Sequence, residues 1–258
     1  MIIDNQVFID QVRALYLRDP GAISNIAYHK LEGLLKESTT YQIDEGDKQG
    51  LYALRRNQLI FYWSNQQERF LVPPEQLDGL SFLVLHGDYY HLVADTLANL
   101  TAKEGHPLFY DYTFRQSLPA SGHYEVTDFN FADDRDYLAA AEIITGTKTG
   151  YTVSPKRVRN WMGDRAFDPS LWLLARERCS GQPVGVGISA YYVPIQEADL
   201  DWFFVDPAHQ GKGIGRMLIA ATVARCLPKA KIIRLGGIAD DFYQKCGFRR
   251  GDRWFVIS

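Results

Sequence analysis

The sequence predicts a folded, soluble α/β protein of two domains, and three observations carry this prediction. The chain has 258 residues, and at roughly 150 residues per domain this length allows one large domain or two ordinary ones. With 46% apolar and 23% charged residues, its composition is close to the globular average and excludes collagen-like, coiled-coil and disordered classes. Strand-like and helix-like segments also succeed one another along the second half, as in mixed α/β domains.

The first domain, residues 1–120, is predicted to be a mixed α/β domain. Helical periodicity occurs near both ends of its first third. Leucine and valine recur at close to helical spacing between positions 92 and 100, which predicts a helix from about Tyr89 to Lys103. Strand-like segments rich in Tyr, Leu and Phe cover residues 51–63, 81–86 and 107–114.

A change of pattern marks the boundary between the two domains. The run SLPASGH, from Ser117 to His123, contains proline, serine and glycine, which are turn-forming residues. We therefore place the second domain at residues 124–258.

The second domain shows a clearer order of elements. Asp133 or Asp134 can cap a helix, and the pair Ser154-Pro155 is typical of the start of another. Turn residues at 180–183 join two strand-like runs into a hairpin. The predicted strands are residues 124–131, 171–178, 184–193, 199–205, 232–235 and 254–257, with one helix after the glycine-rich turn and a short helix before the last strand.

Charge and targeting signals narrow the partners and the compartment. The net charge of −3 is too near balance for a nucleic-acid surface built on bulk charge. Three cysteines without C-x-x-C spacing indicate neither a disulfide framework nor a zinc site, and we expect no metal. Acidic residues from position 4 do not fit a signal peptide, and no apolar run approaches about 18 residues. We expect a cytoplasmic protein that contacts no membrane.

The strongest local signal lies between Val205 and the following helix. A strand ends at Val205, Pro207 blocks its continuation, and Gly211, Gly213 and Gly215 lead into a helix. Glycines in a strand-to-helix turn let several N–H groups point into one concavity, where the helix N-terminus adds about half a positive charge. We expect an anion there, most simply a diphosphate, with charge-assisted contacts from Lys212 and Arg216. The alternative is a tight turn with no ligand.

Two other phosphate-binding loops are excluded by spacing. A P-loop requires G-x-x-x-x-G-K-[ST], which does not occur. A dinucleotide fingerprint requires G-x-G-x-x-G, but Leu218 stands where the third glycine belongs, and the preceding strands are predicted to be antiparallel. NAD is therefore disfavoured.

The same residues resemble the GNAT superfamily of N-acyltransferases. Its acyl-coenzyme A motif, [Q/R]-x-x-G-x-[G/A], is matched by Gln210–Gly215, and the segment FYQKCGF from Phe242 to Phe248 is similar to a late element of the family. The resemblance covers residues from about 124 to 258. One departure is Gly236, which occupies a position where many members carry a coenzyme-contacting asparagine.

The resemblance implies a mostly antiparallel sheet splayed in a V and flanked by helices. The pantetheine arm of acetyl-coenzyme A would lie between the strand that ends at Val205 and the strand at 232–235. Backbone groups of Phe203, Phe204 and Val205 would bind that arm. The amides that would hold the diphosphate belong to Gln210, Gly211, Lys212, Gly213, Ile214, Gly215 and Arg216.

Candidate catalytic residues follow from the chemistry of acetyl transfer to an amine. Tyr243 matches the motif tyrosine that would protonate the departing thiolate; its alternative role is core packing. A lysine-like ammonium is neutral only about once in 2,500 molecules at pH 7, so a carboxylate that accepts its proton is useful. By resemblance that residue is Asp199, with Asp201 as a second candidate. Strict alternation would put both on one strand face and Trp202 and Phe204 on the other. Either carboxylate could instead only decorate a solvated face.

Several other residues have simpler interpretations. Cys246 is better explained as a small buried residue than as an acyl-relay thiol. The acidic pair at 240 and 241 is better explained by helix capping than by catalysis. Four residues could line an acceptor pocket, although core packing is the simpler role for each: Trp161, Met162, Tyr191 and Tyr192.

Taken together, these features predict an N-acetyltransferase that moves an acetyl group from acetyl-coenzyme A to a primary amine by direct attack in a ternary complex. The alternatives are a non-catalytic acyl-coenzyme A-binding or sensing module and an interaction protein whose motif is only a turn. The acceptor, a small molecule or a peptide amine, is left open, as is a homodimer. Residues 1–120 would be an accessory domain or a diverged copy of the same fold that lost its loop.

Overall fold

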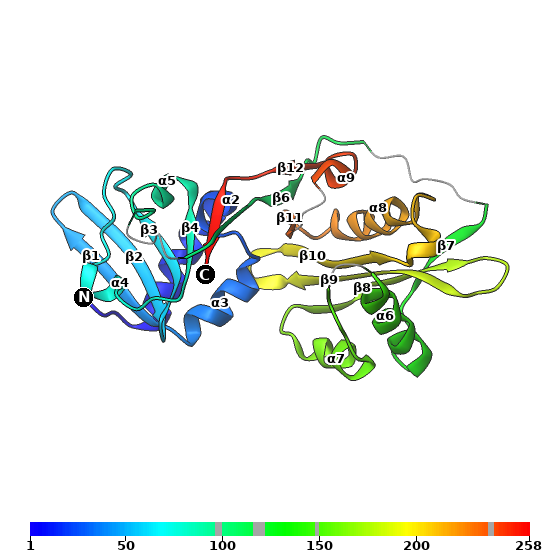
Figure 1. Ribbon diagram of the computed structural model, residues 1–258. Coiled ribbons are helices and arrows are strands. Elements are labelled where there is room, and N and C mark those ends of the chain that lie inside the picture. The colour runs from blue at the N-terminus through cyan, green and yellow to red at the C-terminus, as the bar shows by residue number, and fades with distance from the viewer. Residues whose placement is uncertain (96–99, 116–121, 148–149, 237–239) are drawn as a thin grey trace. The chain divides into compact units, whose positions relative to one another are not determined.

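The computed structural model describes residues 1–95, 100–115, 122–147, 150–236 and 240–258, which form two compact units (Figure 1). The first unit consists chiefly of Met1–Leu108 and Arg250–Ser258. The second consists chiefly of Phe109–Leu235 and the segment that ends at Arg249. Among the helices of the described residues, none is both long enough and apolar enough to cross a bilayer.

The second unit is a seven-stranded sheet with helices on both faces. Its strand order is β12-β6-β11-β10-β9-β8-β7. Its strands are β6 (Pro107–Tyr110), β7 (Tyr124–Asp128), β8 (Phe167–Glu177), β9 (Pro183–Tyr192), β10 (Glu197–Val205), β11 (Ile232–Gly236) and β12 (Phe248–Arg250). Its helices are α6 (Asp134–Gly146), α7 (Pro155–Asn160), α8 (Ile214–Cys226) and α9 (Asp240–Gln244), and short 3₁₀ turns are η1 (Trp161–Gly163), η2 (Val193–Ile195) and η3 (Pro207–His209).

The expected caps start the first two helices of this unit. The carboxylate of Asp133 accepts a hydrogen bond from the Arg135 N–H, and the Ser154 hydroxyl accepts one from the Arg157 N–H. Such bonds satisfy N–H groups that the first helical turn leaves without partners. Both helix starts were predicted from sequence, and both predictions are confirmed.

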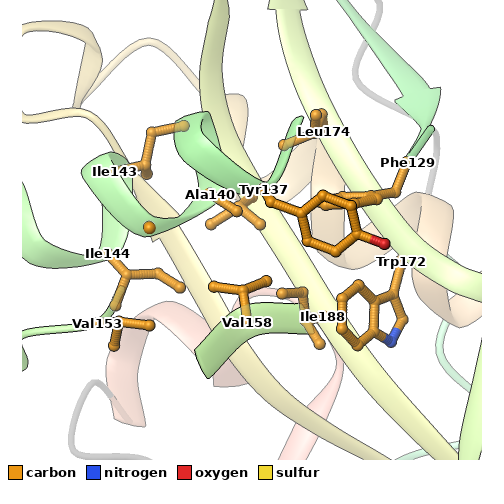
Figure 2. Packing of buried hydrophobic residues seen from close by; sticks show 12 residues of the cluster. Phe129, Tyr137, Ala140, Ile143, Ile144, Val153, Val158, Trp172, Leu174 and Ile188 are labelled. Atoms are coloured by element: carbon orange, nitrogen blue, oxygen red, sulfur yellow. The ribbon is translucent and has the colours of Figure 1, made fainter. Parts of the chain in front are cut away.

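Two apolar layers hold these helices to the sheet. Against one face, Tyr137, Ala140 and Ile144 of α6 and Val158 of α7 form one buried cluster with strand residues that include Trp172 of β8 (Figure 2). Against the other face lies α8. The contact consists of apolar residues of β8 and β9 on one side and of α8 on the other: Leu173, Ala175, Val184, Ile214, Met217 and Leu218.

Two glycines of β9 allow close packing on the α8 side. A Cβ at Gly185 would lie 3.1 Å from Ile214 Cγ2 and Leu218 Cδ1 of α8. A Cβ at Gly187 would lie 2.8 Å from Phe203 Cε1 of β10. These distances are shorter than normal carbon contacts, which lie at about 3.5–4.0 Å. The glycines therefore set how deeply α8 and Phe203 sit on the sheet.

The sheet opens between β10 and β11. These strands are parallel and pair only from Glu197 with Ile232 to Leu200 with Leu235. Beyond Leu200, β10 continues to Val205 while paired with β9 on its other edge. The mostly antiparallel, splayed sheet that the family resemblance implied is thus present.

The first unit has its own six-stranded sheet, of order β1-β2-β3-β4-β13-β5. Its strands are β1 (Thr39–Glu45), β2 (Lys48–Arg55), β3 (Gln58–Ser64), β4 (Phe82–His86), β5 (Ala102–Gly105) and β13 (Trp254–Ile257). Its helices are α1 (Asn5–Arg18), α2 (Pro20–Ile23), α3 (Tyr28–Lys36), α4 (Pro74–Leu77) and α5 (Gly87–Tyr90).

Two strands lie in a different sheet from the one expected. We predicted that the strand at 254–257 completes the second domain, but β13 pairs with β4 and β5 of the first unit. Conversely, β6 follows β5 in the chain and belongs to the sheet of the second unit. Each half of the chain therefore contributes one strand to the sheet of the other. The boundary segment at 117–123 lies mostly outside the described residues.

The predicted helix from Tyr89 to Lys103 was wrong over the residues that the structure describes. The helix α5 ends at Tyr90, residues 91–95 form turns, and β5 begins at Ala102; residues 96–99 lie outside the description. Leu92, Val93 and Leu100 nevertheless pack against the core of the first unit. The spacing of these apolar residues indicates that they are buried, but it does not distinguish a helix from a series of turns, because both can bury them.

Candidate functional site

The glycine-rich loop leaves β10 in a fixed conformation. The Asp206 carboxylate accepts a hydrogen bond from the Ala208 N–H and so shapes the turn after Val205. The Gln210 amide Nε2 donates to the carbonyl oxygen of Val205 at 3.1 Å, which ties the loop to the end of the strand. The side chain of Gln210 thus stabilises the loop. The diphosphate contact expected of Gln210 would be made by its backbone amide.

Two glycines of the loop have backbone conformations that disfavour other residues. Gly211 has φ of 76° and Gly213, the N-cap of α8, has φ of 81°. An L-residue with a Cβ is strained in this left-handed region. Gly215 instead makes room for a neighbouring ring, because a Cβ there would lie only 3.1 Å from Phe242 Cζ.

The loop presents a set of unused hydrogen-bond donors. Within the described chain, the N–H groups of residues 211–216 form no hydrogen bond, and the first helical bond of α8 runs from the Met217 N–H to Gly213. Lys212 and Arg216 are exposed beside them. Unsatisfied N–H groups, the positive end of a helix of 13 residues and two cations together favour an anion.

The segment Phe203–Val205 forms one wall of the opening in the sheet. Phe203 and Val205 pack toward α8, whereas Phe204 packs toward the α6 and α7 side. Backbone groups of an extended strand alternate between its two edges, and β9 takes one edge of β10 here. On the other edge no strand pairs with residues 201–205 among those the structure describes. An extended molecule with amide groups can hydrogen-bond there, as a further strand would.

Tyr243 on α9 is linked to the loop through its neighbour Phe242. The Phe242 ring packs on Gly215, and the ring centroids of Phe242 and Tyr243 lie 5.1 Å apart. Burial raises the pKa of Tyr243 to about 12, and Cys246 adds to the rise. The phenol therefore keeps its proton at neutral pH, as a proton donor must.

Asp199 and Asp201 do not share one face of β10 opposite Trp202 and Phe204, as strict alternation predicted. Leu200 pairs with Ser189 and Trp202 with Ile188, so Asp201 is an extra residue in a β-bulge. Asp199 pairs with Ala190, which lies on the same face of β9 as Ile188. Asp199 therefore shares a face with Trp202, and the expectation that both acids oppose Trp202 and Phe204 was wrong.

The two carboxylates also differ in their surroundings. Asp199 is 4% exposed and stands directly opposite Arg234, which is 1% exposed, in the parallel register of β10 and β11. A buried carboxylate beside a buried guanidinium suits charge balance in the interior. Asp201 is exposed, at the point where pairing with β11 stops.

Other residues from the sequence analysis have structural roles. Cys246 is fully buried and burial raises the pKa of its thiol, which makes it a poor nucleophile. The Tyr191 hydroxyl donates to the carbonyl of Lys229, and Arg165 lies over the Tyr192 ring. Trp161 differs, because it is half-buried and stacks on Trp202.

Sequence reasoning named Trp161 as a possible pocket residue but missed the group of side chains to which it belongs. This group, called here the aromatic cluster, lies on the α6 and α7 side of the sheet and consists of Tyr151 from the link between α6 and α7, Trp161 from η1, and Trp202 and Phe204 from β10. The bulge at Asp201 changes which face of β10 the following side chains lie on, and no residue pattern in the sequence indicates it. Apart from Trp161, the signal was the density of aromatic residues around β10.

Comparisons with known proteins agree with the fold. A family model described as an acetyltransferase (GNAT) domain matches residues 168–250. This match contains β10, the loop, α8 and Tyr243, so the resemblance of the C-terminal half to the GNAT superfamily is confirmed. No curated protein matches the sequence.

Solved structures resemble nearly the whole chain at low sequence identity. A GCN5-related N-acetyltransferase from Sphaerobacter thermophilus shares 14% identity with a TM-score of 0.62, covering 90% of this chain and 85% of that one. A tandem GNAT protein from the clavulanic acid biosynthesis pathway shares 13% identity with a TM-score of 0.62, covering 98% and 94%. A GNAT-family acetyltransferase from Colwellia psychrerythraea shares 13% identity with a TM-score of 0.61, covering 100% and 97%. At this identity they establish the fold.

Proposed function

We propose that the second unit transfers an acetyl group from acetyl-coenzyme A to a primary amine. The observation that carries the proposal is the row of unused N–H groups at residues 211–216, at the N-terminus of α8 and beside the opening between β10 and β11. A diphosphate fits the row of N–H groups at the N-terminus of α8. An amide-bearing pantetheine arm fits the edge of Phe203–Val205 with which no described strand pairs. The family match at residues 168–250 supports this assignment.

The proposed chemistry is direct transfer. The amine nitrogen attacks the thioester carbonyl carbon, a C–N bond forms, and the C–S bond breaks as the thiolate leaves. Tyr243 donates its phenolic proton to the leaving sulfur, and its pKa, raised by burial to about 12, ensures that the phenol is protonated before the transfer. The attacking nitrogen loses its proton to a carboxylate or to water bound by one.

Of the two candidate carboxylates, Asp201 is better placed for the proton transfer. It is exposed where the sheet opens, whereas Asp199 is buried opposite Arg234. Asp201→Asn should lower kcat/KM about 100-fold near pH 7, at the low end of the effects of general bases. The deficit should shrink as the pH approaches the pKa of the amine, because free amine then needs no base.

Asp199→Asn is the comparison for this prediction. It removes a buried charge that faces Arg234, so it should lower the unfolding temperature and leave the shape of the pH–rate profile unchanged. Steady-state rates from pH 6 to 10 and thermal unfolding of both variants distinguish the roles. A pH-dependent deficit in the Asp199 variant alone would reverse the assignment.

We further propose that the first unit is a diverged copy of the same fold. Its β3 pairs in parallel with β4 only at Gln58 and Leu59, and Ile60 is an extra residue in β3 immediately afterwards. The same sequence of features occurs in β10. In the first sheet β13 follows β4, and in the second sheet β6 follows β11. Each of these strands comes from the other half of the chain.

In this copy, the opening beside β3 is filled by a side chain. The Tyr89 hydroxyl, from α5 just after β4, donates to the Ser64 carbonyl at 2.7 Å and accepts from the Ser64 N–H at 3.2 Å. Ser64 is the last residue of β3, and Tyr89 is buried. The backbone groups of Ser64, at the end of this edge, are therefore satisfied internally, and residues 65–78 contain no glycine for a phosphate loop.

Calorimetry on the full chain tests both assignments. Acetyl-coenzyme A should bind with a stoichiometry of one per chain. Absence of heat at millimolar ligand would mean that the loop is only a turn. Two sites per chain would contradict the closed first unit. Binding without transfer to any primary amine would identify a non-catalytic coenzyme-binding module.

A further inference from the structure

The aromatic cluster is a wall of partly accessible rings. The rings of Trp161 and Trp202 stack with centroids 4.6 Å apart, and Tyr151 meets Trp202 edge-on at 5.4 Å. Tyr151 is 53% exposed, and Trp161, Trp202 and Phe204 are half-buried. The cluster rests on the core layer of α6 and α7, which fixes its inner side and leaves the outer side to solvent.

This wall borders the opening in the sheet from the side opposite the loop. Trp202 and Phe204 lie on the part of β10 that no longer pairs with β11, and they point away from α8. Phe203 and Val205 point toward α8, whose N-terminus carries the loop. A thioester whose diphosphate end is held at that loop, and whose arm follows β10, reaches the opening beside Trp202.

The charges around the wall discriminate among amines. Asp201 precedes Trp202 and supplies one exposed carboxylate. By contrast, α7 leads directly into Trp161 and carries the exposed cations Lys156 and Arg157, whereas its Arg159 is ion-paired with Asp134. An acceptor with a single ammonium needs only the carboxylate of Asp201, whereas the further ammonium groups of a polyamine would meet the cations Lys156 and Arg157.

We propose that the amine acceptor is a small primary amine that carries a planar aromatic group and no second cation, with Trp161 as the main specificity-determining residue. This inference rests on the proposed acetyl transfer and goes further by naming the acceptor class. Flat rings prefer to stack on or meet other rings edge-on at centroid distances of about 4.5–7 Å. An ammonium near the same rings gains a cation–π contact until it is deprotonated.

The test compares amines that differ in one feature. Coenzyme A release from acetyl-coenzyme A is followed for tryptamine, n-butylamine, spermidine and kanamycin with the full-length protein. Tryptamine should exceed each of the others at least 10-fold in kcat/KM. Trp161→Ala should raise the KM for tryptamine about 10-fold and leave that for n-butylamine within twofold, and Trp161→Phe should restore most of the loss. Leu138→Ala, an exposed apolar residue on α6, should change neither value.

Direct binding separates failure of this inference from failure of the proposed function. Tryptamine binding is measured by calorimetry in the presence of coenzyme A, and it should weaken in Trp161→Ala. A preference for spermidine or kanamycin, or equal losses for tryptamine and n-butylamine in Trp161→Ala, would overturn the inference while acetyl transfer stands. Binding of tryptamine through Trp161 with no transfer to any amine would overturn the catalytic assignment and keep the acceptor site. Neither binding nor transfer would overturn both.

Discussion

Tyr243→Phe should lower kcat about 100-fold while the Kd for acetyl-coenzyme A stays within twofold. The substitution removes only the hydroxyl, so the ring keeps its contacts with Phe242 and Phe248. General acids typically contribute 100-fold or more to rate, and a thiolate, as a fairly good leaving group, places the expected value at the low end. Stopped-flow measurement of thiol release and calorimetric titration of the coenzyme report the two quantities separately.

The pH profile of the unmodified protein gives a second check on Tyr243. Because burial raises its pKa to about 12, the phenol stays protonated through the range in which the protein can be assayed. The rate should rise with pH as the amine loses its proton, with no descending limb from Tyr243 below about pH 11. A fall in kcat centred near pH 10 would show that Tyr243 ionises as an ordinary tyrosine.

Tyr112→Phe is the matched control for this substitution. Although Tyr112 is exposed as a whole, desolvation of its phenol also raises its pKa to about 12, and the hydroxyl donates to the Ala230 carbonyl at 3.0 Å. Loss of that hydrogen bond should cost about 1 kcal/mol of stability without affecting turnover. If both variants lose activity equally, the effect is one of folding, and Tyr243 is a packing residue.

Much of the second unit could be predicted from the sequence because its signals are local. A cap such as Ser154-Pro155, a hairpin turn and a glycine-rich loop each depend on a few adjacent residues whose backbone preferences are strong. The loop was found in this way, and the structure gives Gly211 and Gly213 the positive φ angles that only glycine adopts easily.

Other features depend on distant residues and left no local signal. The strand β13 has an ordinary apolar sequence, and its place between β4 and β5 is set by those partners. The bulge at Asp201 likewise follows from the register with β9. It reversed the predicted faces of Asp199 and Trp202, since one added residue moves every later side chain to the other face.

Gly213→Val should weaken acetyl-coenzyme A binding about 100-fold. Gly213 has φ of 81° and open space around its Cα, so the substitution adds backbone strain without a clash. A β-branched residue in this conformation costs about 1–3 kcal/mol. The loop can relieve that strain by rotating the adjacent peptide planes, which turns the N–H groups of residues 211–216 away from a common centre. About 2.7 kcal/mol of lost binding corresponds to the 100-fold change.

Gly181→Val is the matched control, because Gly181 also has a positive φ, of 70°, and open space around it, but lies in the turn between β8 and β9. Both variants should lose a similar amount of stability by thermal unfolding. Only the Gly213 variant should show the raised Kd in calorimetry, and raised salt should weaken the remaining binding because the ligand is an anion. Equal affinity in the two variants would mean that the amides at the start of α8 do not bind the coenzyme. Tyr243 would then have no thiolate to protonate, so this measurement decides whether the catalytic assignment has a basis.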